Sequence, residues 1–241
     1  MWNPFRRKQS IRKSGLLRGM TDVHCHLLPG VDDGIPTLEA CLEALDFLAN
    51  EGVAHLFLTP HLMGDLPDNR PDTLQERFEW LKSQYHGPIQ MRLCGEYMLD
   101  PAFKQQRTLG LLAFPGNRVL VETSYMSAPP DLLEMLYDLT LDGYWPILAH
   151  PERYLYMQPR DYGRLKEKGY HFQLNLMSLA GVYGEYQAKT ARDLLKSGFY
   201  DYVGSDLHRT ELYDRALSHL YLTKTEEKAL QRLFVNNGNL W

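Results

Sequence analysis

The fold of this chain is organised around residues 21–34, which read TDVHCHLLPGVDDG. Two histidines stand two residues apart, and two adjacent aspartates follow within one short loop. If residues 20–26 form a strand, alternation places Asp22, His24 and His26 on one side of it and turns Cys25 to the other, where we expect it to pack. Two imidazoles at this spacing can bind one metal ion, so further ligands are expected elsewhere in the chain.

Short apolar stretches alternate with helical patterns along the rest of the sequence. Strands are expected at residues 19–24, 54–59, 91–96, 118–122, 145–149, 171–175 and 202–205. Apolar residues at spacings of three and four predict helices near residues 38–49, 72–85, 132–139 and 188–195. Glycine closes a helix in the left-handed conformation, and it stands before a predicted strand at Gly52, Gly143, Gly169 and Gly198.

The alternation of strands and helices predicts an α/β fold with parallel strands. Seven strands in succession favour a closed or nearly closed β/α barrel, with an open doubly wound sheet as the alternative. The sequence contains neither a GxGxxG fingerprint nor a P-loop, so no nucleotide motif supports the open sheet. We expect residues 19–241 to form one domain behind a basic arm, residues 1–18.

The charge distribution separates this arm from the body. Residues 1–18 hold six basic side chains and no acid, although the whole chain has a net charge of −4. We expect a mobile or loosely packed arm, and weak contact with anionic lipid or an acidic partner is the alternative. The acidic body argues against nucleic-acid binding and suits a carboxylate site for divalent cations.

The class of protein follows from what the sequence lacks. No apolar run is long enough to span a bilayer or to form the core of a signal peptide. The three cysteines are widely separated and form no CxxC pair, which fits a reducing compartment. We therefore expect a cytoplasmic protein.

Residue types that bind metals follow six of the seven predicted strands, and in β/α barrels the active site forms at that end of the strands. Each of these residues alone has an ordinary structural explanation. Packed together without cations, so many carboxylates and imidazoles would be unfavourable. Nitrogen and oxygen ligands without thiolate suit Mn²⁺, Fe²⁺ or Zn²⁺, and two or three ions are the natural count. The metal-binding residue types at these ends are His24, His26, Asp32, Asp33, His61, Glu96, Glu122, His150, Asp206 and His208.

The chain resembles the polymerase and histidinol phosphatase (PHP) superfamily in the order of His24-Cys25-His26, His61, Glu96, Glu122, His150 and Asp206-Leu207-His208. Four motifs narrow the resemblance to one branch. They are HxHxLPGVDDG at residues 24–34, TPH at 59–61, HPERY at 150–154 and GSDLH at 204–208. Together they are most similar to the bacterial capsule and exopolysaccharide protein-tyrosine phosphatases. The resemblance covers residues 20–240 and implies a distorted (β/α)₇ TIM-like barrel with a trinuclear site. That site is typically manganese-dependent, with Fe²⁺, Zn²⁺ or Mg²⁺ as alternatives.

Carried over position by position, the resemblance implies three groups of ligands that share one bridging carboxylate. The groups are His24, His26, Glu96 and Asp206; Glu96, Glu122 and His150; and Asp33, His61 and His208.

The resemblance also implies roles for residues that bind substrate or orient the metal ligands. Arg153 matches the family's phosphate-binding arginine, whose planar fork can bind a phosphate through two hydrogen bonds. Asp22 and Asp32 are expected to orient ligands, and Asp32 is also a candidate for proton handling near the attacking water. Relatives often carry a second arginine after the last histidine. Arg209 is predicted as this substrate contact, although neither it nor Arg215 is obviously in register.

The implied activity is hydrolysis of phosphotyrosine by a metal-activated hydroxide. The implied partner is a membrane-associated bacterial tyrosine autokinase that regulates capsular or exopolysaccharide synthesis. Another PHP phosphoesterase, either a histidinol-phosphate-type phosphatase or a phosphodiesterase, is the nearest alternative, and a non-catalytic metal-binding module is the next. No cysteine is followed six positions later by arginine, so the thiol-dependent tyrosine phosphatase motif is missing. Loop tyrosines such as Tyr125 and Tyr183 are candidates for stacking on the substrate ring or for ordinary packing.

Overall fold

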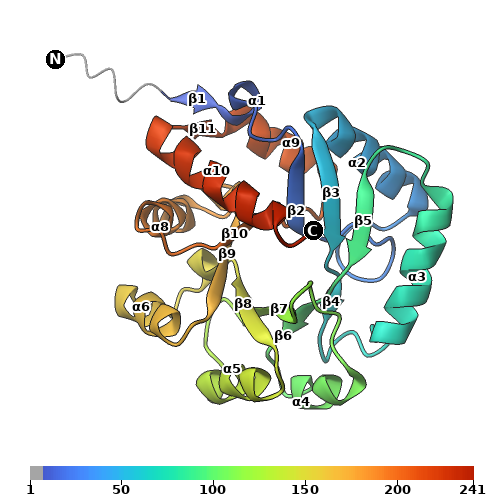
Figure 1. The fold of residues 1–241 in the computed structure, drawn as a ribbon, viewed down its shortest axis with the longest axis vertical. Coiled ribbons are helices and arrows are strands. Elements are labelled where there is room, and N and C mark those ends of the chain that lie inside the picture. The colour runs from blue at the N-terminus through green and yellow to red at the C-terminus, as the bar shows by residue number, and fades with distance from the viewer. Residues whose placement is uncertain (1–7) are drawn as a thin grey trace.

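Parallel strands alternate with helices in the computed structural model, which describes residues 8–241. The strands of the two main sheets are β2 (Met20–Cys25), β3 (Val53–Leu58), β4 (His61–Leu62), β5 (Gln90–Leu93), β6 (Glu96–Met98), β7 (Arg118–Glu122), β8 (Trp145–Ala149), β9 (His171–Asn175) and β10 (Tyr202–Gly204). One sheet has the order β10-β9-β8-β7-β6-β4, and the other has the order β2-β3-β5. All pairs within these sheets are parallel (Figure 1).

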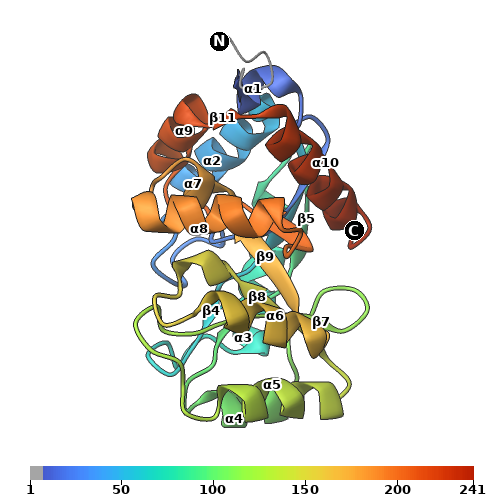
Figure 2. The same ribbon diagram turned by 90° about the vertical axis from the view of Figure 1, so that its left-hand side faces the viewer.

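Helices cover the outer faces of these strands. The longer ones are α2 (Leu38–Glu51), α3 (Pro71–Gln84), α5 (Leu132–Leu141), α6 (Pro159–Glu167), α8 (Glu185–Lys196), α9 (Thr210–His219) and α10 (Lys224–Gly238). The short ones are α1 (Ile11–Ser14), α4 (Phe103–Gln106) and α7 (Leu176–Leu179), with 3-10 turns η2 (Arg107–Leu109) and η3 (Pro151–Arg153). Figure 2 shows α5, α6 and α8 one above another beside β8 and β9. No helix within residues 8–241 has the length and apolar character needed to cross a membrane.

The parallel α/β architecture expected from the sequence is confirmed, with differences at two strands. The four predicted glycines all have positive φ angles, for example 98° at Gly52 and 71° at Gly198. The strands expected at 54–59 and 91–96 are both interrupted, after Leu58 and after Leu93. Pro60, which has no amide hydrogen to donate, lies in the first interruption. The chain resumes there as β4 and β6.

These interruptions connect the two sheets. β3 pairs with β5 in the smaller sheet, whereas their continuations β4 and β6 pair in the larger sheet. On the other side, the segment after β10 reaches the end of β2. The amide of Asp206 donates to the carbonyl of His24 at 2.7 Å, and the amide of His26 donates to the carbonyl of Leu207 at 2.9 Å. The carboxyl ends of strands from both sheets therefore surround one region.

Strand β2 has an irregular register, although the side chains of His24, Cys25 and His26 alternate as expected. Its register against β3 shifts between Asp22 and Cys25. Asp22 is fully buried and accepts hydrogen bonds from the amides of Ser205 at 2.9 Å and His24 at 3.2 Å. It therefore fixes the backbone of His24, which fits the orienting role expected for Asp22. Cys25 is buried in the main apolar cluster, as expected.

A second, smaller apolar cluster lies between the strands. It brings together Val23, Phe57, Cys94, Phe114, Leu120, Ile147, Ala149, Tyr202 and Leu240. The terminal Trp241 packs against it, with its ring 4.5 Å from the His55 ring and 5.3 Å from the Phe57 ring. Apolar packing between the strands provides a rigid base for the polar residues at their carboxyl ends.

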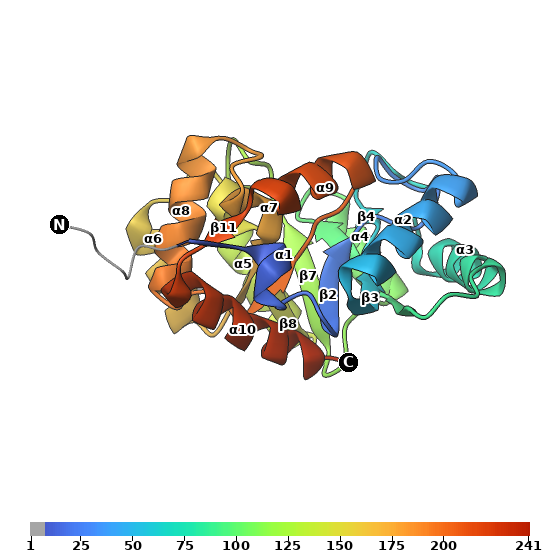
Figure 3. The same cartoon turned by 90° about the horizontal axis from the view of Figure 1, so that it is seen from above.

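The described part of the basic arm is packed on the domain. Strand β1 (Gln9–Ser10) pairs antiparallel with β11 (Tyr221–Leu222), and α1 lies beside α9 (Figure 3). Ile11 is fully buried, and Arg12 donates hydrogen bonds to Glu51 and Asp214. The expectation of a mobile or loosely packed arm is wrong for this part, because burying apolar surface outweighs the entropy of ordering it. Residues 1–7 of the predicted arm lie outside the described residues.

Candidate metal centre

All nine predicted ligands gather where the carboxyl ends of the strands meet. They fall into four overlapping groups, and the ligand atoms of each group lie within 4.8 Å of one another. The groups are His24, His26 and Asp206; His24, Glu96 and His150; His61, Glu96 and Glu122; and His26, Asp33, His61 and His208. The sequence prediction that these side chains converge is therefore confirmed.

Two of these residues sit in strained turns. His150 follows β8 with φ of 33°, and Asp206 lies two residues beyond β10 with φ of 52°. Residues other than glycine rarely adopt such angles, and each instance costs about 1–3 kcal/mol. In each turn the side chain leaves the strand direction and joins the cluster. Such strain concentrates at functional sites because surrounding packing must hold it.

The innermost part of the site contains atoms that are unusually close. The Nε2 atoms of His24 and His26 are 3.1 Å apart, and each lies 3.2 Å from Oε2 of Glu96. Oδ1 of Asp206 lies 3.4 Å from the His24 nitrogen. These four side chains are almost completely buried. Their ligand atoms all approach the same small volume.

Two buried atoms indicate that this volume suits a cation. Nδ1 of His61 lies 3.1 Å from Oε2 of Glu96, yet neither atom has a hydrogen-bond partner among the described residues. Buried polar atoms normally find a partner, and leaving one unmade is costly. A cation placed between the two atoms would satisfy both lone pairs. The nitrogen and oxygen donors fit Mn²⁺, Fe²⁺ or Zn²⁺ by their chemistry.

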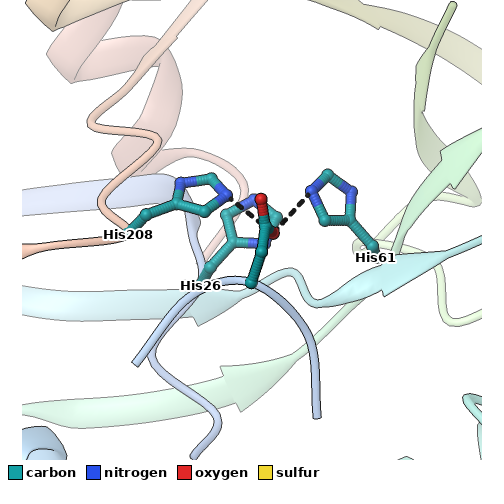
Figure 4. Close-up of side chains that lie close together, drawn as sticks. His26, His61 and His208 are labelled. Atoms are coloured by element: carbon teal, nitrogen blue, oxygen red, sulfur yellow. Dashed lines mark ion pairs between the residues drawn. The ribbon is translucent and has the colours of Figure 1, made fainter. Parts of the chain in front are cut away.

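The group nearest to solvent is built around Asp33. Its Oδ1 atom lies 3.4 Å from Nε2 of His61 and 3.3 Å from Nε2 of His208. Figure 4 shows these two histidines on opposite sides of the carboxylate, with His26 behind it. The Asp33 side chain is 76% exposed, whereas the inner ligands are buried. The site is therefore open to solvent on the Asp33 side.

Asp32 holds one ligand in place from behind. Its Oδ2 atom lies 2.8 Å from Nδ1 of His26 and accepts the amide hydrogen of His61 at 3.1 Å. Its Oδ1 accepts the amide of Gly34 at 3.0 Å. A carboxylate on Nδ1 fixes the imidazole tautomer and leaves Nε2 free to face the site. The orienting role expected for Asp32 fits this geometry, and its proton-handling role stays a prediction.

Strand β9 contributes two residues that sequence reasoning missed. Gln173 places Oε1 3.0 Å from Nδ1 of His24, and Asn175 donates from Nδ2 to Oδ2 of Asp206 at 2.7 Å. Both side chains are fully buried. The sequence carried a signal for them, because Gln173 and Asn175 alternate with the apolar Phe172 and Leu174. Polar residues at alternate positions of a strand point to one face.

The two candidate phosphate contacts occupy different surroundings. Arg153 ends the turn η3 and donates from Nη1 to Oδ2 of Asp206 at 2.8 Å, so it borders the ligand cluster. Arg209 precedes α9, next to His208, and its side chain is exposed. Within residues 8–241 it forms no ion pair. Its predicted contact with substrate stays a prediction.

Neighbouring carboxylates favour the protonated form of the inner histidines. Burial lowers the pKa of His24, but the charges of Glu96 and Asp206 outweigh this effect and raise it overall. Burial and the nearby His26 lower the pKa of His61, whereas the adjacent carboxylates of Asp33 and Glu122 raise it to about 10. Without a cation, protons on the histidines thus balance the charge of the buried acids.

We expect metal binding to release protons, because a ligand imidazole must be neutral. The pKa of His61 is raised from 6.5 to about 10, so its stabilising proton is fully bound below pH 6.5 and is lost as the pH rises through 10. Metal affinity should therefore increase with pH across this window. Calorimetric titration with Mn²⁺ in buffers of different ionisation enthalpy measures the released protons. Affinity that does not change with pH would contradict this prediction.

Comparison with known sequences gives a consistent set of relatives. A family model described as "Capsular polysaccharide synthesis, CpsB/CapC" matches residues 20–240. The chain is 29% identical over 200 residues to tyrosine-protein phosphatase YwqE of Bacillus subtilis, covering 78% of this chain and 77% of that protein. It is 26% identical over 208 residues to tyrosine-protein phosphatase CpsB of Streptococcus agalactiae, covering 78% and 83%.

Solved structures agree with these matches. A structure from work on YwqE of Bacillus subtilis and CpsB of Streptococcus pneumoniae, described as unique metal-dependent tyrosine phosphatases, matches with a TM-score of 0.79 and 25% identity. The match covers 92% of this chain and 94% of that chain. An organophosphorus hydrolase from Deinococcus radiodurans shares the fold alone, with a TM-score of 0.53, 14% identity and 94% coverage of each chain.

Proposed function

This chain belongs to the capsular polysaccharide synthesis CpsB/CapC family, and we propose that it is a metal-dependent protein-tyrosine phosphatase. The observation that carries the proposal is the complete cluster of nine nitrogen and oxygen ligands with Arg153 at its border. The family's curated members at 26–29% identity are named tyrosine-protein phosphatases. The site thus has the parts needed to bind and hydrolyse a phosphomonoester.

The cluster would hold two or three divalent ions, and manganese is the proposed metal. The inner ion would be bound by His24, His26, Glu96 and Asp206; the second by Glu96, Glu122 and His150; and the third by Asp33, His61 and His208. When bound, these ions supply Lewis acidity, which lowers the pKa of water and neutralises charge on the phosphoryl oxygens. The partnerless buried atoms of His61 and Glu96 support a cation in the site, and Nδ1 of His61 faces Glu96 and Glu122 while its Nε2 faces Asp33.

The protein's own side chains then bind and orient the phosphate. Arg153 contributes a fixed positive charge, and its guanidinium can donate two parallel hydrogen bonds to phosphoryl oxygens. Asp32 keeps the His26 ring in one orientation, and Gln173 does the same for His24. The phenolate of phosphotyrosine leaves readily, so the reaction makes a modest demand on a general acid. Arg209 is the proposed second contact to substrate.

The proposal also covers the fold of the catalytic domain, the substrate and the cellular location. The catalytic domain spans residues 19–241 and forms a distorted (β/α)₇ barrel, supported by the continuation of β3 and β5 into β4 and β6 of the larger sheet and by the bridge between Cys25 and Leu207. The substrate is a phosphotyrosine on a membrane-associated tyrosine kinase of capsule synthesis. Because such phosphotyrosines lie on the cytoplasmic side, we place the enzyme in the cytoplasm.

Chelation and thiol alkylation together test this mechanism. A chelator should abolish phosphotyrosine hydrolysis, and added Mn²⁺ should restore it, because the site needs bound cations. Alkylation should leave activity intact, because Cys25, Cys41 and Cys94 are all buried. Burial also raises the pKa of the Cys41 thiol to about 12, so it does not form a reactive thiolate. Inactivation by alkylation with resistance to chelation would refute the proposal.

A further inference from the structure

The guanidinium of Arg153 lies over two tyrosine rings. Its Cζ atom is 4.2 Å from the ring centroid of Tyr125 and 4.1 Å from that of Tyr183. The Arg153 side chain is only 15% exposed. Aromatic rings attract a cation placed over their faces, and a planar guanidinium stacks well on them. The two tyrosines therefore restrict the plane in which the Arg153 guanidinium lies.

Both tyrosines lie close to residues of the candidate metal centre, and backbone or side-chain hydrogen bonds hold them there. Tyr125 stands three residues after the ligand Glu122, and its carbonyl accepts the amide hydrogen of Leu155 at 2.8 Å. Tyr183 lies in a turn between Gly181 and Gly184, both with positive φ angles. Its hydroxyl accepts a hydrogen bond from Asn175 at 3.1 Å and lies 3.4 Å from Oδ2 of Asp206.

The stack continues behind Tyr125 into the core. The ring of Tyr154 lies 6.5 Å from that of Tyr125 with planes 25° apart, and the ring of Tyr156 lies 5.6 Å from Tyr154 at 10°. Tyr154 is fully buried. The Tyr125 ring, which contacts Arg153 on one side, is therefore followed by two further aromatic rings on its other side. This packing limits the movement of Tyr125.

One edge of the Arg153 guanidinium is available to a ligand. Both tyrosine rings lie against the guanidinium, and Nη1 donates to Asp206 at 2.8 Å. Within the described part of the chain, Nε and Nη2 of Arg153 donate to no residue. These two nitrogens form one edge of the planar fork, and an edge of this kind matches two phosphate oxygens.

We propose that Tyr125 and Tyr183 are positioning residues that hold Arg153 with its free edge ready for the phosphate group. This inference rests on the proposed function, because it takes the Arg153 edge as the phosphate contact. Loss of either ring releases the guanidinium to other rotamers, and misplacement by about 1 Å can cost up to 10²-fold in rate. The tyrosines act through Arg153, so their effect should disappear when Arg153 is absent.

Binding of inorganic phosphate to the metal-loaded protein, measured by calorimetry, tests the inference without relying on turnover. We expect Tyr125→Leu and Tyr183→Leu to weaken phosphate binding about 10-fold, because a mobile guanidinium binds less well. Tyr125→Phe and Tyr183→Phe keep the ring and should recover most of the affinity. Tyr137→Leu, at a tyrosine 57% exposed on α5, is the matched control. Metal content is measured in each variant.

A double-mutant cycle separates positioning from a general structural effect. In an Arg153→Ala background, Tyr125→Leu should weaken phosphate binding no further. An equal loss in both backgrounds, unchanged affinity in the single variant, or a loss explained by missing metal would each overturn the inference. If Tyr183→Leu does not fold, the more exposed Tyr125 still provides the test. Failure of the proposed function would appear differently, as phosphate binding without hydrolysis of phosphotyrosine by the unmodified protein.

Discussion

His150→Ala should lower kcat/KM for a phosphotyrosyl peptide by about 10³-fold. The Nε2 atom of His150 lies 3.2 Å from Oε1 of Glu96 in the buried part of the site, so alanine removes a proposed ligand and leaves a cavity. Lewis-acid assistance is worth several kcal/mol, and each 1.36 kcal/mol is tenfold in rate. Steady-state kinetics after metal reconstitution measures the loss, and elemental analysis shows whether the variant binds less metal.

The matched control is His171→Ala. His171 starts β9 at the opposite end of the strand and pairs with Asp201 at 3.4 Å, so it lies away from the ligand cluster. Its removal should leave kcat/KM within about twofold, as usual for a partly exposed residue outside the site. Equal activity of the His150 variant and the unmodified enzyme would refute the ligand assignment.

Arg153→Ala should lower kcat/KM by about 10²-fold to 10³-fold. Hydrogen bonds to charged groups contribute about 1.5–3 kcal/mol each, and this arginine can offer two to the phosphate. Arg153→Lys should recover little, because an ammonium group offers a point charge instead of a planar fork. Steady-state kinetics on the same peptide, with metal content measured in parallel, provides the comparison.

Arg160→Ala is the control for this substitution. Arg160 is 81% exposed on α6 and forms only a long pair with Asp161, so its removal should not change hydrolysis. Full activity of Arg153→Lys would show that positive charge alone is sufficient, which would contradict the two-bond role. Full activity of Arg153→Ala would remove Arg153 from the site altogether.

The sequence was sufficient to predict which side chains converge, because each lies near the end of a strand in a short, recognisable motif. His24 and His26 are two residues apart, and Asp206 and His208 repeat that spacing. Parallel strands bring their carboxyl ends to one edge, so local patterns translate directly into a shared location. The structure confirms this convergence for every predicted ligand.

Features that depend on contacts between distant segments were not predictable in the same way. The register shift in β2 arises from pairing with β3, and no local signal marks it. The packing of Ile11 depends on β11, which lies about 210 residues later in the chain. Asn175 reaches the site by donating a hydrogen bond to Asp206, which lies in the loop after β10. Such pairings are decided by tertiary packing rather than by local propensity.

The most direct test of the proposed phosphotyrosine phosphatase activity is the substrate selectivity of the protein reconstituted with Mn²⁺. Phosphotyrosyl peptide, phosphoseryl peptide, histidinol phosphate and a phosphodiester are compared by kcat/KM, with a chelated sample as the blank. We predict that the phosphotyrosyl peptide gives a kcat/KM at least about tenfold above the others, a difference of about 1.4 kcal/mol in transition-state binding. A higher kcat/KM for histidinol phosphate or the diester, or equal activity in the chelated sample, would contradict it.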